Sequence, residues 1–141
     1  MKLNTIGKCS LILSILLTTT AYAKNDKILC PSVEKIQQAS QQINDAFLYD
    51  GTYRITTSAP VFEESNLSWL VGVNDIVAGS SDEAIEIAKA TANKTNHKKN
   101  EYAEVLTGPI NYYVCHYGPG DVGAIGFATG SNSARKLSMR N

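Results

Sequence analysis

Two cysteines, Cys30 and Cys115, bracket most of this chain, and their pairing constrains the fold more than any other feature. A disulfide between them would close a loop containing most of a domain, for which the chain-entropy model gives a stabilisation of about 4 to 5 kcal/mol. That amount is comparable to the whole net stability of a small domain. The chain has a third cysteine, Cys9, so the pairing depends on the fate of the N-terminal segment.

The N-terminal segment has the three parts of a secretory signal. Lys2 and Lys8 precede an apolar run over residues 11–17, and Ala21-Tyr22-Ala23 offers a small-residue cleavage site before a charged stretch. The run is far shorter than the roughly 18 apolar residues of a membrane span. We therefore predict a signal peptide over residues 1–23, and an exported protein, periplasmic or secreted, that does not span the membrane.

Cleavage would remove Cys9 and leave Cys30 and Cys115 as an even pair in an oxidising compartment, where such pairs usually form a disulfide. The remaining chain suits one domain, which we place at residues 24–130, followed by a flexible polar tail at residues 131–141. Its basic and acidic residues nearly balance, and no basic patch typical of a nucleic-acid-binding protein is present.

Periodicity in the sequence predicts two helices and about five strands. Apolar residues recur at helical spacing over residues 31–44, with Pro31 in the first turn, and Ser80 and Glu83 form a capping box for a second helix. Strands are predicted at residues 52–57, 67–77, 101–106, 110–117 and 122–129. This order favours an α+β domain in which an antiparallel sheet of about five strands carries two helices packed on one face, closed by one disulfide.

Residues 110–117 carry most of the chemistry-bearing side chains. Alternation places Tyr113, Cys115 and Tyr117 on one face and Tyr112 and His116 on the other. If Cys115 bonds to Cys30, which precedes the first helix, the helix covers the Cys115 face. Tyr112 and His116 then point away from the helix, where they either decorate an open sheet face or contact a ligand.

Tyrosine and histidine are both axial ligands of haem iron, so Tyr112 and His116 are candidate haem ligands. Four residues along a strand separate their α-carbons by about 13 Å, too far for both to ligate one iron. His97, in the polar stretch after the second helix, is the candidate for a second ligand, or else a solvated loop residue. The Cys30-Pro31 dipeptide has the form of a haem-regulatory motif, but a disulfide would remove the thiolate which that role needs.

Other motifs give no catalytic assignment. Residues 118–123 spell G-x-G-x-x-G, but a strand and not a helix is predicted after them, so we regard the match as accidental. The chain has no G-x-S-x-G and no H-E-x-x-H motif, and two distant histidines with one cysteine pair are a poor set of zinc ligands. We therefore expect no catalytic residues and no required cofactor, although the fold could still assemble a Ser/His or Glu/His site.

Several of these features together resemble a known family. They are the signal, Cys30-Pro31, the strand with the only tryptophan, Trp69, the helix cap at residues 81–84 and the run at residues 112–116. The chain resembles a family of small exported bacterial proteins of unassigned function that includes the hemin-binding protein Hbp. The resemblance implies haem acquisition or association, so we expect a non-enzymatic binding protein with haem as its ligand. The alternatives are a secreted protein–protein interaction module or effector and, third, a small hydrolase.

Overall fold

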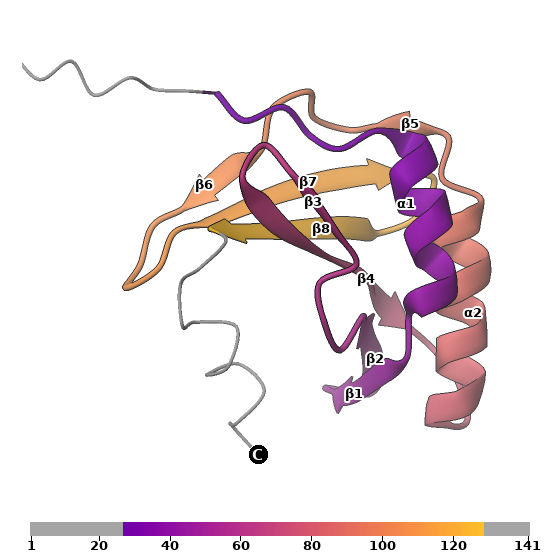
Figure 1. The fold of residues 1–141 in the computed structure, drawn as a ribbon. Coiled ribbons are helices and arrows are strands. Elements are labelled where there is room, and N and C mark those ends of the chain that lie inside the picture. Colours follow the sequence, from indigo (N-terminus) through magenta and orange to yellow (C-terminus); the bar gives the residue numbers. More distant parts are fainter. Residues whose placement is uncertain (1–26, 129–141) are drawn as a thin grey trace, which may run out of the picture.

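A computed structural model of the chain describes residues 27–128, so the predicted signal peptide and polar tail lie outside the described residues. An antiparallel sheet and two α-helices make an α+β fold, as predicted, with both helices on one side of the sheet (Figure 1). The sheet has eight strands and not about five. They are β1 (Asp45–Tyr49), β2 (Thr52–Thr56), β3 (Phe62–Glu64), β4 (Leu67–Ile76), β5 (His97–Lys98), β6 (Glu104–Leu106), β7 (Tyr112–Gly118) and β8 (Val122–Ala128).

The strands follow the order β1-β2-β4-β8-β7-β5, with β3 paired to β4 and β6 paired to β7. Three of them, β1, β3 and β5, were not predicted from the sequence. β1 and β2 form a hairpin around Asp50-Gly51, whose positive φ angles of 49° and 79° suit a two-residue turn. β3 and β5 have three and two residues, too few to produce a periodic pattern.

The first helix is shorter than the predicted residues 31–44. α1 (Val33–Ala39) ends in a single 3₁₀ turn, Ser40–Gln42, and Ser32 is its N-cap, accepting a hydrogen bond from the Lys35 N–H at 3.4 Å. Pro31 therefore precedes the helix and does not lie in its first turn.

The second helix, α2 (Ser81–Asn93), begins at the predicted cap. The Ser80 hydroxyl accepts a hydrogen bond from the Glu83 N–H at 3.2 Å. In a capping box the Glu83 carboxylate would accept a second hydrogen bond from the Ser80 N–H. Here it accepts from the Gly79 N–H at 2.7 Å, one residue earlier.

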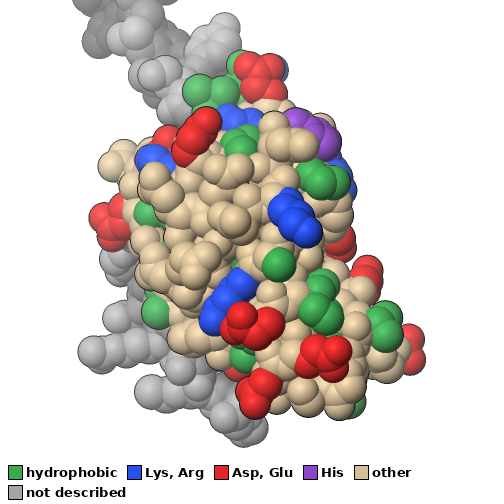
Figure 2. All heavy atoms as spheres, turned by 90° about the vertical axis from the view of Figure 1, so that its right-hand side faces the viewer, with side chains coloured by type: hydrophobic (Ala, Val, Ile, Leu, Met, Phe, Trp, Pro, Cys, Tyr) green, Lys and Arg blue, Asp and Glu red, His purple; other side chains and the backbone are tan. Residues whose placement is uncertain are grey.

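The core lies between the helices and one face of the sheet. The fully buried residues that α2 contributes are all alanines, Ala84, Ala88 and Ala92, which let the helix approach the sheet closely, and the partly buried Ile85 packs beside them. On the sheet side Trp69 and Tyr117 are the largest fully buried residues. The outer side of the helices carries both acidic and basic side chains, and several of the acidic ones lie toward the lower end of the view (Figure 2).

The predicted disulfide is present. Cys30 and Cys115 are bonded with their α-carbons 5.7 Å apart, and both are buried. This bond holds the segment before α1 against β7, and the Tyr117 phenol on the same face donates a hydrogen bond to the Pro31 carbonyl at 2.9 Å. Burial raises the pKa of this phenol. The prediction that Cys115 and Tyr117 share a covered face is confirmed.

Candidate functional site

The sheet face that does not carry the helices contains a hollow of about 140 Å³. It extends over five strands, from β1 through β2, β4 and β8 to β7. The residues that line it are Phe47, Arg54, Ile55, Thr56, Leu70, Gly72, Asn74, Val114, His116, Gly123 and Ile125.

Two glycines form the floor of this hollow. Gly72 of β4 pairs with Gly123 of β8, and the same row continues to His116 on one side and Thr56 on the other. Opposite residues of paired strands point to the same face of a sheet. The row therefore has side chains at its two ends and none in the middle, which produces the depression.

The wall beside this row is apolar. Val114, Ile125 and Leu70 lie opposite one another on β7, β8 and β4. Ile125 is 42% exposed although it lies in an inner strand of the sheet, and Phe47 of β1 is 51% exposed. Exposed apolar side chains grouped on one face are typical of an interaction surface.

Polar groups stand at the ends of the hollow. Arg54 of β2 lies opposite Phe47, and its guanidinium is stacked 4.2 Å from the centre of the Tyr49 ring. Asn74 of β4 also lines the hollow. The hollow thus combines an apolar wall with an imidazole, a guanidinium, an amide and a hydroxyl.

His116 is held in place through its backbone. Its N–H donates to the Asn100 side-chain oxygen at 2.7 Å, and its carbonyl accepts from the Lys99 N–H at 2.8 Å. The Asn100 side chain also donates to the Val114 carbonyl at 3.3 Å. It therefore satisfies the backbone groups of β7 that lie between the stretches paired with β5 and β6. The half-buried imidazole borders the hollow.

Tyr112 lies on the same face of β7 as His116, as the alternation predicted, but it does not line the hollow. It pairs with Leu106 of β6 and is half-buried. The structure therefore separates these two candidates along the strand.

His97 is exposed on β5, directly opposite Gly118. Its ring packs over the α-carbon of Gly118, in the space that a Cβ there would occupy, and its Nδ1 lies 2.6 Å from the Asn96 side-chain oxygen. By register His97 shares the face of His116, but it does not line the hollow. Of the three candidates only His116 borders it.

Arg54 and the glycine pair were missed by the sequence reasoning. Arg54 is the only charged residue of β2, and its alternation with Ile55 was a usable signal that it points away from the core. The importance of Gly72 and Gly123 depends on the register between β4 and β8, which no local pattern reveals.

The glycine-rich run at residues 118–123 joins β7 to β8 and opens no helix. It therefore cannot present helix N-terminal amides to a pyrophosphate. Its last glycine, Gly123, belongs to the floor of the hollow. The Cys30-Pro31 motif has no free thiol, because Cys30 is bonded to Cys115.

Within residues 27–128, no group of three or more His, Cys, Asp or Glu side chains is arranged to hold a metal ion. In the same range no helix has the length and apolarity needed to cross a membrane.

Comparison of the chain with protein-family models, with curated proteins and with solved structures finds no match. The chemistry of the hollow is therefore the basis for a functional assignment.

Proposed function

We propose that this chain is an exported, non-enzymatic binding protein that holds its ligand on the open sheet face at His116, and that the ligand is haem. The observation that carries the proposal is the position of His116, whose imidazole borders a hollow with an apolar wall formed by Val114, Ile125 and Leu70. The resemblance to a family that includes a hemin-binding protein supports the same ligand.

Haem is a flat apolar ring with an iron at its centre and two carboxylates at one edge. A neutral imidazole is a common ligand of haem iron, and an arginine is suited to pair with carboxylates. His116 would supply the first of these groups, Arg54 the second, and the apolar wall would contact the ring. The haem iron would take His116 as its one protein ligand, since neither Tyr112 nor His97 borders the hollow.

The size of the hollow sets the mode of binding. Pockets that enclose small ligands measure about 300 to 1,000 Å³, whereas this hollow measures about 140 Å³. A ligand as large as haem would therefore rest across the hollow with part of its surface in solvent. Such exposure suits a protein that takes up and releases its ligand.

Titration of the purified chain, beginning at Lys24, with hemin tests the proposal. We expect a shift of the Soret band that is lost in His116→Ala and retained in the matched control His97→Ala, a histidine on the same face outside the hollow. Tyr112→Phe should also retain it. No Soret shift in the unmodified chain would refute haem, and a shift unchanged by His116→Ala would refute the site.

A second variant tests the hollow itself. A Cβ at Gly123 would meet only ordinary contact, 3.7 Å from the Cys115 carbonyl oxygen, so Gly123→Val fills the floor with little disturbance of the backbone. We expect this variant to fold, as judged by its circular dichroism, and to bind hemin more weakly. Unchanged affinity would place the ligand elsewhere.

The exposure of Ile125 and Phe47 favours a second candidate, a protein partner docked on the same face. For this candidate Ile125→Lys should abolish capture of a partner from an extract of exported proteins. Val105→Lys, a change at a similarly exposed residue of β6, should retain it. Capture that is equal for the two variants would exclude the open face.

The geometry gives less support to the third candidate, a small hydrolase. No serine or cysteine lines the hollow, and the Thr56 hydroxyl donates to backbone carbonyls. Three strand spacings separate Thr56 from His116, which is about 14 Å and too far for a nucleophile and its base. Turnover of generic ester or peptide substrates that is lost in His116→Ala would overturn the non-enzymatic proposal.

A further inference from the structure

β1 is an edge strand, and within residues 27–128 it pairs with β2 alone. Alternate residues of such a strand turn their N–H and C=O groups toward the free edge. Natural edge strands are usually protected by lysine, proline or a bulge. β1 has none of these, since its sequence is DAFLY and its register with β2 is unbroken from Asp45 to Tyr49.

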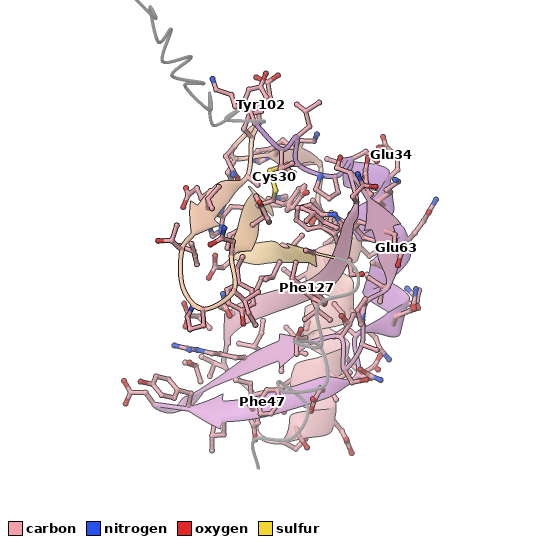
Figure 3. The ribbon with its side chains drawn as sticks, turned by 60° about the vertical axis from the view of Figure 1, so that its left-hand side comes forward. Cys30, Glu34, Phe47, Glu63, Tyr102 and Phe127 are labelled. Carbon is pink, nitrogen blue, oxygen red and sulfur yellow. A yellow bond between two sulfur atoms is a disulfide. The ribbon has the colours of Figure 1, made fainter. Side chains whose placement is uncertain are left out.

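The side chains of the last three residues of this strand are also uncovered, whereas Asp45 and Ala46 are half-buried. Phe47, Leu48 and Tyr49 are 51%, 65% and 60% exposed, and because they are consecutive they project from both faces of the sheet. Figure 3 shows Phe47 on the outermost strand, at the end of the sheet away from Cys30. A further strand paired to β1 would cover apolar surface on both faces at once.

We infer that the occupant of this edge is a second copy of the chain, with the two β1 strands antiparallel about a two-fold axis at Phe47. This register pairs all five residues. It places Phe47 opposite the second copy's Phe47, Ala46 opposite the second copy's Leu48, and Asp45 opposite the second copy's Tyr49. The interface is then self-complementary, as a two-fold dimer requires.

The charges of the edge fit the same register. Asp45, Phe47 and Tyr49 lie on the face that carries the hollow, and the Arg54 guanidinium covers the Tyr49 ring at 4.2 Å. The second copy's Asp45, opposite Tyr49, would therefore come beside Arg54, and symmetry repeats the pair. Asp45 makes no ion pair within the described part of the chain, and no like charges face each other across the axis.

The dimer would also extend the binding face. Phe47 lines the hollow at its β1 end, so the two hollows would adjoin across the pair of Phe47 rings. Each copy would then contribute a residue to the other's site, and the two hollows together approach the volume of a small ligand pocket, about 300 Å³. The dimer follows from the edge strand alone and does not depend on which ligand the hollow binds.

Sedimentation velocity of the chain beginning at Lys24 tests this inference. We expect a dimer at micromolar concentrations for the unmodified chain and a monomer for Leu48→Lys. The variant has a lysine in the β1 edge strand of each copy, and a lysine in an edge strand opposes its pairing with another strand. The control is Leu106→Lys, a change at a similarly exposed residue of β6 that should leave the dimer intact. A monomeric unmodified chain, or a dimer that persists in Leu48→Lys, would overturn the inference.

Two further experiments, a cross-link and a charge exchange, test the register. Phe47→Cys lies on the axis and should form an intermolecular disulfide under mild oxidation, whereas Leu106→Cys should not. Asp45→Arg should weaken the dimer, and the exchanged variant Asp45→Arg/Arg54→Asp should restore it. A dimer that forms without the Phe47→Cys cross-link, or without rescue by the exchange, would refute pairing about Phe47.

Discussion

Gly72 of β4 lies directly opposite Gly123 of β8, and the floor of the hollow carries no side chain because these two residues meet there. Their surroundings nevertheless differ. A Cβ at Gly72 would lie 2.7 Å from the Ile55 carbonyl oxygen, whereas a Cβ at Gly123 would lie no closer than 3.7 Å to any heavy atom outside its chain neighbours. Of these two positions, only position 72 requires a glycine because of the close approach of a neighbouring backbone.

Alanine at these two positions should therefore have unequal effects. We expect Gly72→Ala to lower the free energy of unfolding by about 1 to 3 kcal/mol, the usual range for overpacking. Gly123→Ala should change it by less than about 1 kcal/mol. Urea denaturation midpoints measured at an unchanged m value give the comparison. Equal losses would show that the hollow does not have the open floor described above.

Gly126 should also resist substitution, because the Trp69 ring lies over it. A Cβ there would be 3.0 Å from three ring atoms, and the ring is held by a hydrogen bond from its N–H to the Glu64 carbonyl at 3.2 Å. We expect Gly126→Ala to destabilise the protein by about 1 to 3 kcal/mol. Since Trp69 is the only tryptophan, its fluorescence should change as well.

Gly108→Ala is the control for this prediction, because a Cβ at Gly108 meets only the Ile110 carbonyl oxygen at 3.4 Å. It should leave both stability and fluorescence nearly unchanged. An unaltered fluorescence spectrum in Gly126→Ala would contradict the predicted contact.

Tyr117 should make stability fall at alkaline pH. Burial raises the pKa of its phenol above the ordinary value of about 10. Below that pH both states keep the proton and the contribution of Tyr117 is complete. Above it the unfolded chain loses the proton while the folded chain retains it, so the free energy of unfolding decreases as pH rises.

Tyr117→Phe isolates this contribution. At neutral pH we expect the variant to be less stable by about 1 kcal/mol, because the hydrogen bond to Pro31 is lost. The difference between the two proteins should shrink above about pH 10. Thermal melts over a range of alkaline pH provide the measurement, and a difference independent of pH would argue against burial of the phenol.

The disulfide should supply a large part of the stability. Its 85-residue separation corresponds to about 4 to 5 kcal/mol in the chain-entropy model. The double variant Cys30→Ala/Cys115→Ala should therefore unfold at a much lower urea concentration. Because both cysteines are buried, we expect reductant to act on the native protein only after it unfolds. Two free thiols in the unreduced chain, counted by intact mass after alkylation, would contradict the bridge.

Features recorded in local patterns were predictable from the sequence. The alternation of β4 and the Ser80 cap of α2 each follow from neighbouring residues, and the burial of Cys115 follows from its expected bond to Cys30. From the alternation along β7 the direction of His116 was also predicted.

Features that depend on the register between distant strands were not predictable. β1 was missed because its apolar residues are consecutive and do not alternate, which reflects their exposure at an edge. The hollow was missed because it exists only where the register of β8 places Gly123 between Gly72 and His116. Arg54 joins the site for the same reason.

The bond between Cys30 and Cys115 also makes the fold tolerant of backbone cleavage. A protease that cuts one peptide bond between these residues, for example in the exposed stretch at residues 107–109, leaves two fragments that remain covalently joined. The nicked protein would keep its sheet pairing and migrate as one species until it is reduced. Wherever proteases act on the folded protein, the cross-link would thus preserve the molecule after damage as well as before it.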